Sequence, residues 1–562
     1  MKKILIILVV IAVMLAVLVA ALGGWAYFTF LHTEPLSDAE VAELSPDWDE
    51  VTGGNWSPWW DRGDGMIQWN PTASYNEWMM SIPDEEKAWP ILIEAYYDHH
   101  LGFYKESGYL EYSGTLPHHS ERWALWRELI ETDAFMEITD RIQGATSREY
   151  LGAELREGTE RFEHAMMMEY GYEDTDPITG NPNDPSMMNI QLGWLGRLRS
   201  TGTLVSARAV YELEEGNTDE FVRFIESAHT LAGYAREFPI LISELVYMAL
   251  EYVINQTITW GLIAHPDAFD ASHLERLDAI LADQGAFEFE WGIEQMGFHD
   301  SVRRMCDAGG EFSPTQIATY EFSGPACSLP IEELGPTAQR MLHVYRMSLA
   351  QGDALGAIPW DEDLEEMGSV LERERDALNK ITNTMLEVLI PALDPIPSRV
   401  RNFKQENIAL RLALAAYLHR DRHGTFPESI DAIDKDLMTF DPIDAFTGES
   451  LKYTIRDGLP LIYSVGDNRT DDGGMIRWGF TDPDVHGNQR RTQTWPEWWS
   501  SDEAAQHRAS NPDQSHGDWV IFPIPVGDPA PIEDIDYDPD WDLKQDGMYN
   551  EESGAVSIPD DG

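Results

Sequence analysis

The first 34 residues of the chain contain the feature that most restricts its fold, a long apolar run. Lys2 and Lys3 precede residues 4–31, which carry no charge. As an α-helix this run is long enough to cross the roughly 30 Å hydrocarbon core of a bilayer. Trp25 and Phe28 fall where an interfacial aromatic belt would lie, and the paired lysines favour a cytoplasmic N-terminus. The run predicts a transmembrane helix, with everything after about residue 34 exported.

A cleaved signal peptide is the alternative interpretation, because Val19-Ala20-Ala21 can serve as a cleavage site. The apolar run is longer than the core of a usual signal peptide, which is about 7–15 residues, so an uncleaved anchor is favoured. The next apolar run, residues 238–263, contains Glu244 and Glu251. Carboxylates within a helical pattern indicate a buried helix of a water-soluble domain rather than a second span.

The charge balance restricts the possible partners. The 562 residues include 99 acidic and 39 basic ones, for a formal net charge of −60. Such a surface repels nucleic-acid phosphates, so nucleic-acid binding is excluded as a function class. Adaptation to a salty environment and recruitment of cations both remain open as reasons for the acidity.

Helical periodicity dominates from about residue 83 to 401, and we predict a mainly α fold built of antiparallel helix hairpins. Apolar residues recur at three- and four-residue spacings in residues 84–107, 120–142, 147–169 and 273–284. The predicted organisation begins with a cytoplasmic stub and transmembrane anchor (1–33) and an irregular Trp-rich linker (34–82). The helical extracytoplasmic domain (83–401) follows, then a small α+β module (402–482). A loop-rich acidic tail, partly disordered, ends the chain (483–562).

One helix of the helical domain carries candidate catalytic residues. Glu244 and Glu251 fall on one stripe together with Ser243, Tyr247 and Asn255. Two carboxylates facing a pocket can perform acid–base chemistry, which would make the chain an envelope hydrolase or a glycan-acting enzyme. The alternative is a solvated helix face. The sequence contains no Gly-x-Ser-x-Gly elbow, Walker loop, dinucleotide fingerprint or His-Glu-x-x-His helix.

The chain has two cysteines, Cys306 and Cys327. In an exported domain, two cysteines this close in sequence predict a disulfide. Closing that loop would stabilise the fold by about 3 kcal/mol through the entropy of the unfolded chain. Two buried thiols are the alternative.

Tryptophans and adjacent histidines suggest two other sites. Of the 20 tryptophans, several cluster near Trp59 and near Trp498, where they either bind glycan or pack irregular segments onto the body. The adjacent histidines form two pairs, His99-His100 and His118-His119. Side chains of adjacent residues on a helix point about 100° apart, so neither pair alone makes a bidentate metal site.

The pattern changes after residue 402. An amphipathic helix is expected to end near His423-Gly424, where glycine suits a left-handed cap. Pro427 and Ser429 then open a short second helix. Residues 451–455 and 459–465 read as two strands joined by a tight turn, and "VIFPIP" at 520–525 can add an edge strand.

This order resembles the C-terminal module of type II secretion major pseudopilins. The matching motifs are Gly424, Phe426 and Pro427 in the step after the helix, Asp441, Pro442, Phe446, Gly448 and Tyr453 in the loop, and Tyr463–Gly466 in the last strand. The resemblance covers about residues 403–480 and implies a pilin-like fold. The anchor lacks the processing site of true pseudopilins, so a subunit of a pseudopilus is not expected.

The resemblance also implies a calcium site after the last strand. Asp467, Asn468, Asp471 and Asp472 supply hard oxygen ligands of the kind that Ca²⁺ prefers. The family's pattern adds Ser464 by position. Gly466, Gly473 and Gly474 permit the positive φ angles that such a loop needs. An ordinary polar turn with Asx-type capping is the alternative.

Together these features predict a single-pass protein of the bacterial cytoplasmic membrane, with its C-terminal domains extracytoplasmic. Its expected role is structural or interactive, with a protein partner in the envelope and a terminal module that binds Ca²⁺. The enzyme and the glycan-binding protein are the alternatives.

Overall fold

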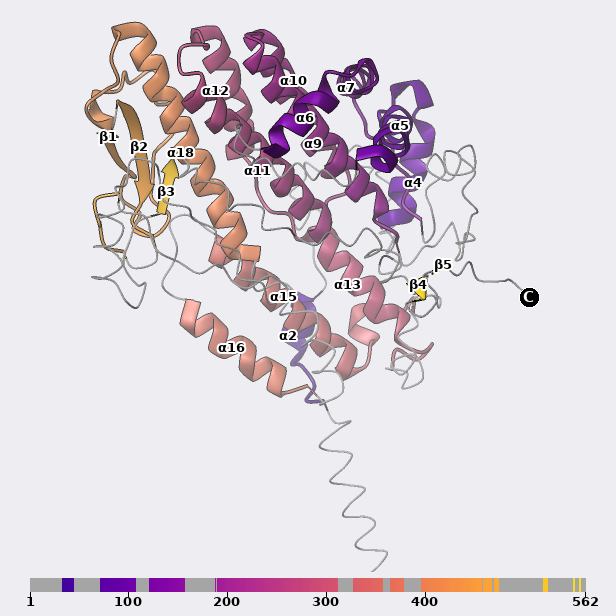
Figure 1. Cartoon of the computed structure of the whole chain (residues 1–562). Helices are drawn as coiled ribbons and strands as arrows, with labels where there is room; N and C mark the ends of the chain where they lie inside the picture. Colours follow the sequence, from indigo (N-terminus) through magenta and orange to yellow (C-terminus); the bar gives the residue numbers. More distant parts are fainter. Residues whose placement is uncertain are drawn as a thin grey trace, which may run out of the picture.

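The computed structural model of the chain describes residues 33–44, 71–107, 121–156, 187, 190–311, 327–356, 364–378, 396–456, 458–466, 469–474, 519–523, 549–550 and 555–556. As predicted, the fold is mainly helical, with a small antiparallel sheet (Figure 1). None of the helices within these ranges combines the length and apolarity of a membrane span. The predicted anchor, residues 4–31, lies outside the described residues, as do the tryptophan clusters near Trp59 and Trp498.

The N-terminal helices include two in the segment that was predicted to be an irregular linker. These are α2 (Asp38–Glu43) and α4 (Pro71–Ser81), followed by the 3-10 turn η1 (Asp84–Glu86), α5 (Trp89–Ser107), α6 (Glu121–Ile130) and α7 (Asp133–Ala145). The expected helix over 120–142 is divided in two at Thr132. The Thr132 side chain accepts a hydrogen bond from the amide of Phe135 and so caps α7.

The helix predicted for residues 147–169 is wrong over its described part, because residues 151–156 are not helical and Gly152 has a φ of 76°. The carboxylate of Glu237 accepts hydrogen bonds from the amides of Leu151 at 2.5 Å and Gly152 at 3.1 Å. The side-chain oxygen of Asn76 accepts a hydrogen bond from the amide of Leu155 at 2.9 Å. These distant side chains satisfy backbone groups that a helix would otherwise pair internally.

The centre of the body is a group of four helices, α9 (Gly193–Glu214), α10 (Thr218–Ala235), α11 (Leu241–Ala264) and α12 (Ala271–Gly285). Helix α10 packs against the other three (Figure 1). Consecutive helices pack on each other in two cases, α9 on α10 and α10 on α11. Gly216 has a φ of 82° in the turn between α9 and α10, where a side chain would be strained. Asn217 occupies the N-cap position of α10, and Thr218 is the first residue of the helix.

The other end of the body comprises α13 (Gly292–Arg304), the 3-10 turn η3 (Ile331–Glu333), α15 (Pro336–Gly356) and α16 (Leu364–Asp376). Residues 33–44 pack here, with α2 beside α15 (Figure 1). The amide of Glu34 donates to the carbonyl oxygen of Ala377 at 3.1 Å. The first described residues are therefore fixed to the body.

The long helix α18 (Ile396–His423) connects the helical body to the terminal sheet. It packs against α12, α15 and α11, and also against β2 and β3. At about 1.5 Å per residue its 28 residues span roughly 42 Å. The predicted boundary at residue 402 falls inside this helix, so the terminal module shares an element with the helical body.

The sheet consists of β1 (Lys452–Arg456), β2 (Leu459–Ser464) and β3 (Trp519–Phe522), in the order β1-β2-β3 and antiparallel throughout. Both predicted strands and the additional edge strand are confirmed. The short helix is the 3-10 turn η5 (Ile430–Ala432), preceded by Ser429. A separate two-stranded pair, β4 (Tyr549–Asn550) and β5 (Ala555–Val556), lies in the segment predicted to be a partly disordered tail.

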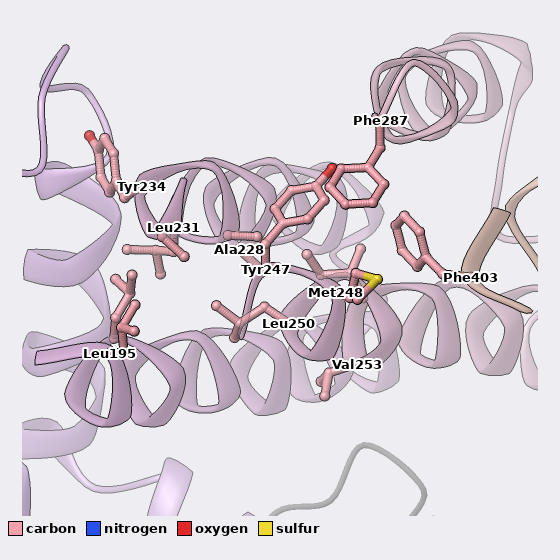
Figure 2. Close-up of a cluster of buried hydrophobic side chains, with 14 of the residues drawn as sticks. Leu195, Ala228, Leu231, Tyr234, Tyr247, Met248, Leu250, Val253, Phe287 and Phe403 are labelled. Carbon is pink, nitrogen blue, oxygen red and sulfur yellow. The ribbon is translucent and has the colours of Figure 1, made fainter. Parts of the chain in front are cut away.

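Aromatic side chains close the core between α11 and α18. Tyr247 stacks on Phe287 with ring centroids 5.1 Å apart, and Phe403 of α18 meets Phe287 edge-on at 5.5 Å. Figure 2 shows these three rings together, with Leu250 and Val253 further along α11. Each offset or edge-to-face pair of this kind stabilises the fold by about 0.5–1.5 kcal/mol beyond the contribution of the apolar area that it buries.

Candidate functional site

The predicted catalytic carboxylate Glu251 lies inside the packing of α10, α11 and α12. Its side chain is 0% exposed, and its Oε1 lies 2.6 Å from Nδ1 of His229. The amide of Gln284 donates to its other oxygen. On the far side of the imidazole, His229 Nε2 lies 3.1 Å from Asp283 Oδ2. Although burial opposes it, the hydrogen bonds that the His229 imidazole donates to the carboxylates of Asp283 and Glu251 raise the pKa of His229 to about 10.

The second candidate, Glu244, is also 0% exposed and is paired with Arg236, whose Nε lies 3.0 Å from Glu244 Oε2. Burial raises the pKa of Glu244 to about 7, and the Arg236 charge opposes that shift. The guanidinium of Arg236 also lies over the ring of Phe287, 4.7 Å from its centroid. Arg236 follows α10, so this pair fastens the end of α10 to the start of α11.

The remaining residues of the stripe are buried as well. Ser243 accepts the amide of Ile240 at 2.9 Å and donates to the carbonyl oxygen of Phe238 at 2.8 Å. Asn255 is 4% exposed, and neither polar atom of its amide has a hydrogen-bond partner among the described residues. The stripe is therefore neither the solvated face nor a pair of carboxylates open to substrate.

The arrangement on α11 fits a structural role. A buried carboxylate whose oxygens are already bonded to a cation and an amide is held in one position. A His229 imidazole that stays protonated up to about pH 10 is unsuited to act as a general base at neutral pH. We interpret these groups as the polar contacts that fix the mutual positions of α10, α11 and α12.

Cys306 and Cys327 are both buried and are free thiols in this structure, so the predicted bridge is not formed in it. Their backbone amides both donate to the carbonyl oxygen of Arg303, at 3.3 and 3.0 Å. Burial, together with the charge of Cys327, raises the pKa of the Cys306 thiol to about 12. The two residues meet at one point of the fold, and a bond between them stays a prediction.

The terminal module is organised around Asp444, a fully buried carboxylate that was not singled out from the sequence. Its Oδ1 accepts the amide of Phe446 at 2.9 Å and the hydroxyl of Ser464 at 3.0 Å, and its Oδ2 accepts the amide of Val465 at 2.9 Å. Gln405 of α18 holds the same loop by accepting the amide of Ala445 at 2.5 Å. Asp444 thus joins the loop to the end of β2.

The predicted calcium loop lies directly after this point, and its backbone has the expected form. Gly466, Gly473 and Gly474 have φ angles of 67°, 75° and 76°. Asp471 Oδ1 accepts the hydroxyl of Tyr463 at 3.1 Å and the amide of Gly473 at 3.0 Å, which is an Asx-type turn. Asp472 is half-buried within the same turn.

The ligand set itself is described only in part. The Ser464 hydroxyl is directed to Asp444, so an ion could use only its backbone carbonyl. Asp467 and Asn468 lie outside the described residues. The glycine backbone and the second oxygen of Asp471 fit a calcium ion, and the site stays a prediction.

No family model matches the chain, and the comparisons with characterised proteins and with solved structures also return no match. The resemblance to pseudopilins therefore stays a prediction that is based on the sequence motifs alone.

One further group was missed in the sequence. His419, His423 and Asp434 converge at the end of α18, and their potential ligand atoms lie within 4.8 Å of one another. The i, i+4 spacing of the two histidines near a helix end was the signal that could have found them. By contrast, Asp98 and Glu94, beside the adjacent pair His99-His100, are bonded to Arg141 at 2.7 and 3.1 Å.

Proposed function

We propose that the chain is a membrane-anchored structural protein of the bacterial envelope. In this proposal a helical extracytoplasmic body holds the small α+β module at a fixed distance from the membrane, where the module meets an envelope protein. The anchor supplies the membrane contact, and Ca²⁺ closes the loop after β2.

The observation that carries the proposal is the way residues 33–35 are fastened to the body. Arg340 of α15 donates from Nε to the carbonyl oxygen of Glu34 at 2.6 Å and from Nη2 to that of Pro35 at 3.2 Å. Thr337 donates to the Thr33 hydroxyl at 3.1 Å. The predicted span ends at residue 31, so almost no chain is left between anchor and body to act as a flexible tether.

The position of the terminal module supports the same role. Helix α18 runs from α15, which binds residues 33–35, to the strands β2 and β3 (Figure 1). The module packs along this helix, with Gln405 near its start bonded to Ala445 and Tyr417 near its end against Phe522. Because the helix is continuous and packed on both halves, the module is held by a rigid element rather than by a linker.

The polar contacts inside the body also favour a scaffold. The carboxylates of Glu244 and Glu251 are matched by Arg236 and His229, and both pairs bridge neighbouring helices. Pairs of this kind fix the register between helices, and we infer the same role for them here.

The proposal is tested on the full chain in cells. We expect the protein to stay in the membrane fraction after carbonate extraction and to be digested by protease added outside the cytoplasmic membrane. Deletion of residues 1–32 should release it. Recovery of the unmodified chain in the carbonate supernatant, or complete protection from external protease, would contradict the anchored topology.

A matched pair of variants tests the fastening itself. Arg340→Ala removes the contacts to Glu34 and Pro35, whereas Arg373→Ala removes an exposed arginine of the neighbouring helix α16. Limited proteolysis of the membrane-bound protein should cut Arg340→Ala near residue 34 faster than the unmodified chain, and Arg373→Ala at the unmodified rate. Equal cleavage rates for the unmodified chain and both variants would show that the Arg340 contacts do not hold residues 34 and 35 on the body, and would contradict this part of the proposal.

A further inference from the structure

Two histidines and an aspartate form a compact group at the C-terminal end of α18. His419 and His423 are four residues apart on one face of the helix, with ring centroids 4.3 Å apart. Asp434 comes from the segment that follows the turn η5. His423 Nε2 lies 3.0 Å from Asp434 Oδ2, and His419 Nδ1 lies 3.6 Å from Asp434 Oδ1.

These separations match those between the ligands of one metal ion. In a tetrahedral zinc site with bonds of about 2.0–2.1 Å, neighbouring ligand atoms lie about 3.3 Å apart. All three potential ligand atoms here lie within 4.8 Å of one another, so small side-chain rotations bring them into that range.

One ring nitrogen lacks a hydrogen bond. His419 has a side chain 12% exposed, and its Nδ1 is buried without a hydrogen-bond partner among the described residues. A buried polar atom without a partner is costly, and a metal bond would satisfy it. His423, at 50% exposed, leaves the open side of the group accessible to water.

The surroundings favour a cation in two ways and oppose it in one. The group lies at the C-terminal end of a 28-residue helix, where the partial charge of the backbone is negative. The net charge of −60 also attracts cations to the surface. The opposing charge is Arg422, whose Nη1 lies 3.3 Å from Asp434 but closer, at 2.7 Å, to Asp436. Arg422 can therefore keep its partner Asp436 when Asp434 turns to a metal.

The donor set indicates which ion would bind. Two imidazole nitrogens and one carboxylate oxygen suit Zn²⁺ and similar transition metals. Ca²⁺ takes oxygen ligands, so this group differs in chemistry from the loop after β2. We propose that His419, His423 and Asp434 form a zinc-type site with three protein ligands and a fourth position open to solvent. The ion would link the end of α18 to the segment after η5.

The test is isothermal titration calorimetry of Zn²⁺ into the full chain, purified in detergent and stripped of metal with a chelator. We expect one saturable site, with affinity reduced tenfold or more in His423→Gln and in Asp434→Asn. His273→Gln is the matched control, because His273 is also bonded to two carboxylates, Asp219 and Asp270, but through opposite ring nitrogens. That control should leave the affinity unchanged.

A second readout guards against indirect effects of the substitutions. Co²⁺ bound in place of Zn²⁺ should give the visible absorption of a low-symmetry four-coordinate site in the unmodified chain, and His419→Gln should remove that absorption. Far-UV circular dichroism of each variant should match the unmodified chain. Failure of Zn²⁺ to bind in a saturable way, or equal Zn²⁺ affinity in the unmodified chain and in His423→Gln, would overturn the proposal.

Discussion

The imidazole of His229 on α10 contacts the buried carboxylate of Glu251 on α11 at 2.6 Å and the exposed carboxylate of Asp283 on α12 at 3.1 Å. One side chain therefore connects three consecutive helices of the body through two ion pairs. One of these partners, Glu251, belongs to the α11 stripe that the sequence suggested for catalysis, and its carboxylate is buried against His229.

This contact predicts a dependence of stability on pH. The pKa of His229 is raised to about 10 in the folded protein from an ordinary value of 6.5. A raised pKa means that the folded state holds the proton more tightly, so the contribution is complete below about pH 6.5 and is lost as pH rises to about 10. In His229→Gln, chemical denaturation should show a free energy of unfolding lower by roughly 2–4 kcal/mol at pH 6, and this difference should shrink at pH 10. A difference that is constant across this range would contradict the raised pKa.

The carboxylate of Asp444 should contribute strongly to the stability of the terminal module. Asp444→Ala leaves the amides of Phe446 and Val465 and the hydroxyl of Ser464 without their acceptor. We expect the free energy of unfolding to fall by about 3 kcal/mol, since each buried unpaired donor costs on the order of 1 kcal/mol or more. The exposed Asp441 is the control, and Asp441→Asn should change stability by at most about 0.5 kcal/mol. Equal effects of the two substitutions would contradict the assigned role.

Calcium binding to the loop after β2 has a direct thermal test. Asp471→Ala and Asp472→Ala should lower the melting temperature when calcium is present and have little effect in chelator, because an ion stabilises only the state that binds it. If the unmodified chain melts at the same temperature with calcium and with chelator, the ion site is removed from the account.

The two buried thiols give a chemical prediction. In chain isolated from an oxidising compartment, we expect Cys306 and Cys327 to be bonded to each other, with a mass two hydrogens lower before reduction than after it. Reduction should then lower the melting temperature, because a loop of this length restricts the unfolded chain by about 3 kcal/mol. Two thiols that react with maleimide in the unfolded, unreduced protein would contradict the bridge.

Local patterns predicted much of this fold. Gly424 has a φ of 81° and ends α18 as its position in the sequence indicated, and the two strands 459–464 and 452–456 pair across their tight turn. These features depend on residues close together in the chain. For the same reason the positive φ angles at Gly466, Gly473 and Gly474 were predictable.

Other features depend on partners far away in sequence and could not be predicted in that way. Glu251 is buried because His229, 22 residues earlier, neutralises it. Residues 151–156 are not helical, because Glu237, 85 residues from Gly152, accepts the amides of Leu151 and Gly152. A helical pattern in residues 147–169 indicates which face is apolar, but not which distant carboxylate competes for the backbone.

The central claim is that the helical body holds the terminal module at a fixed distance from the membrane-proximal residues. Its most direct test is the distribution of distances between helix α2 and the terminal sheet, measured in lipid bilayers by double electron–electron resonance. Spin labels at Ala39 on α2 and Thr454 on β1, both exposed, report the two ends of the body after Cys306 and Cys327 are replaced by alanine. The account predicts one narrow distribution, the same in detergent and in bilayers, because α18 belongs to both halves. A broad distribution, or two separate distances, would show that the terminal module moves independently and would contradict the account.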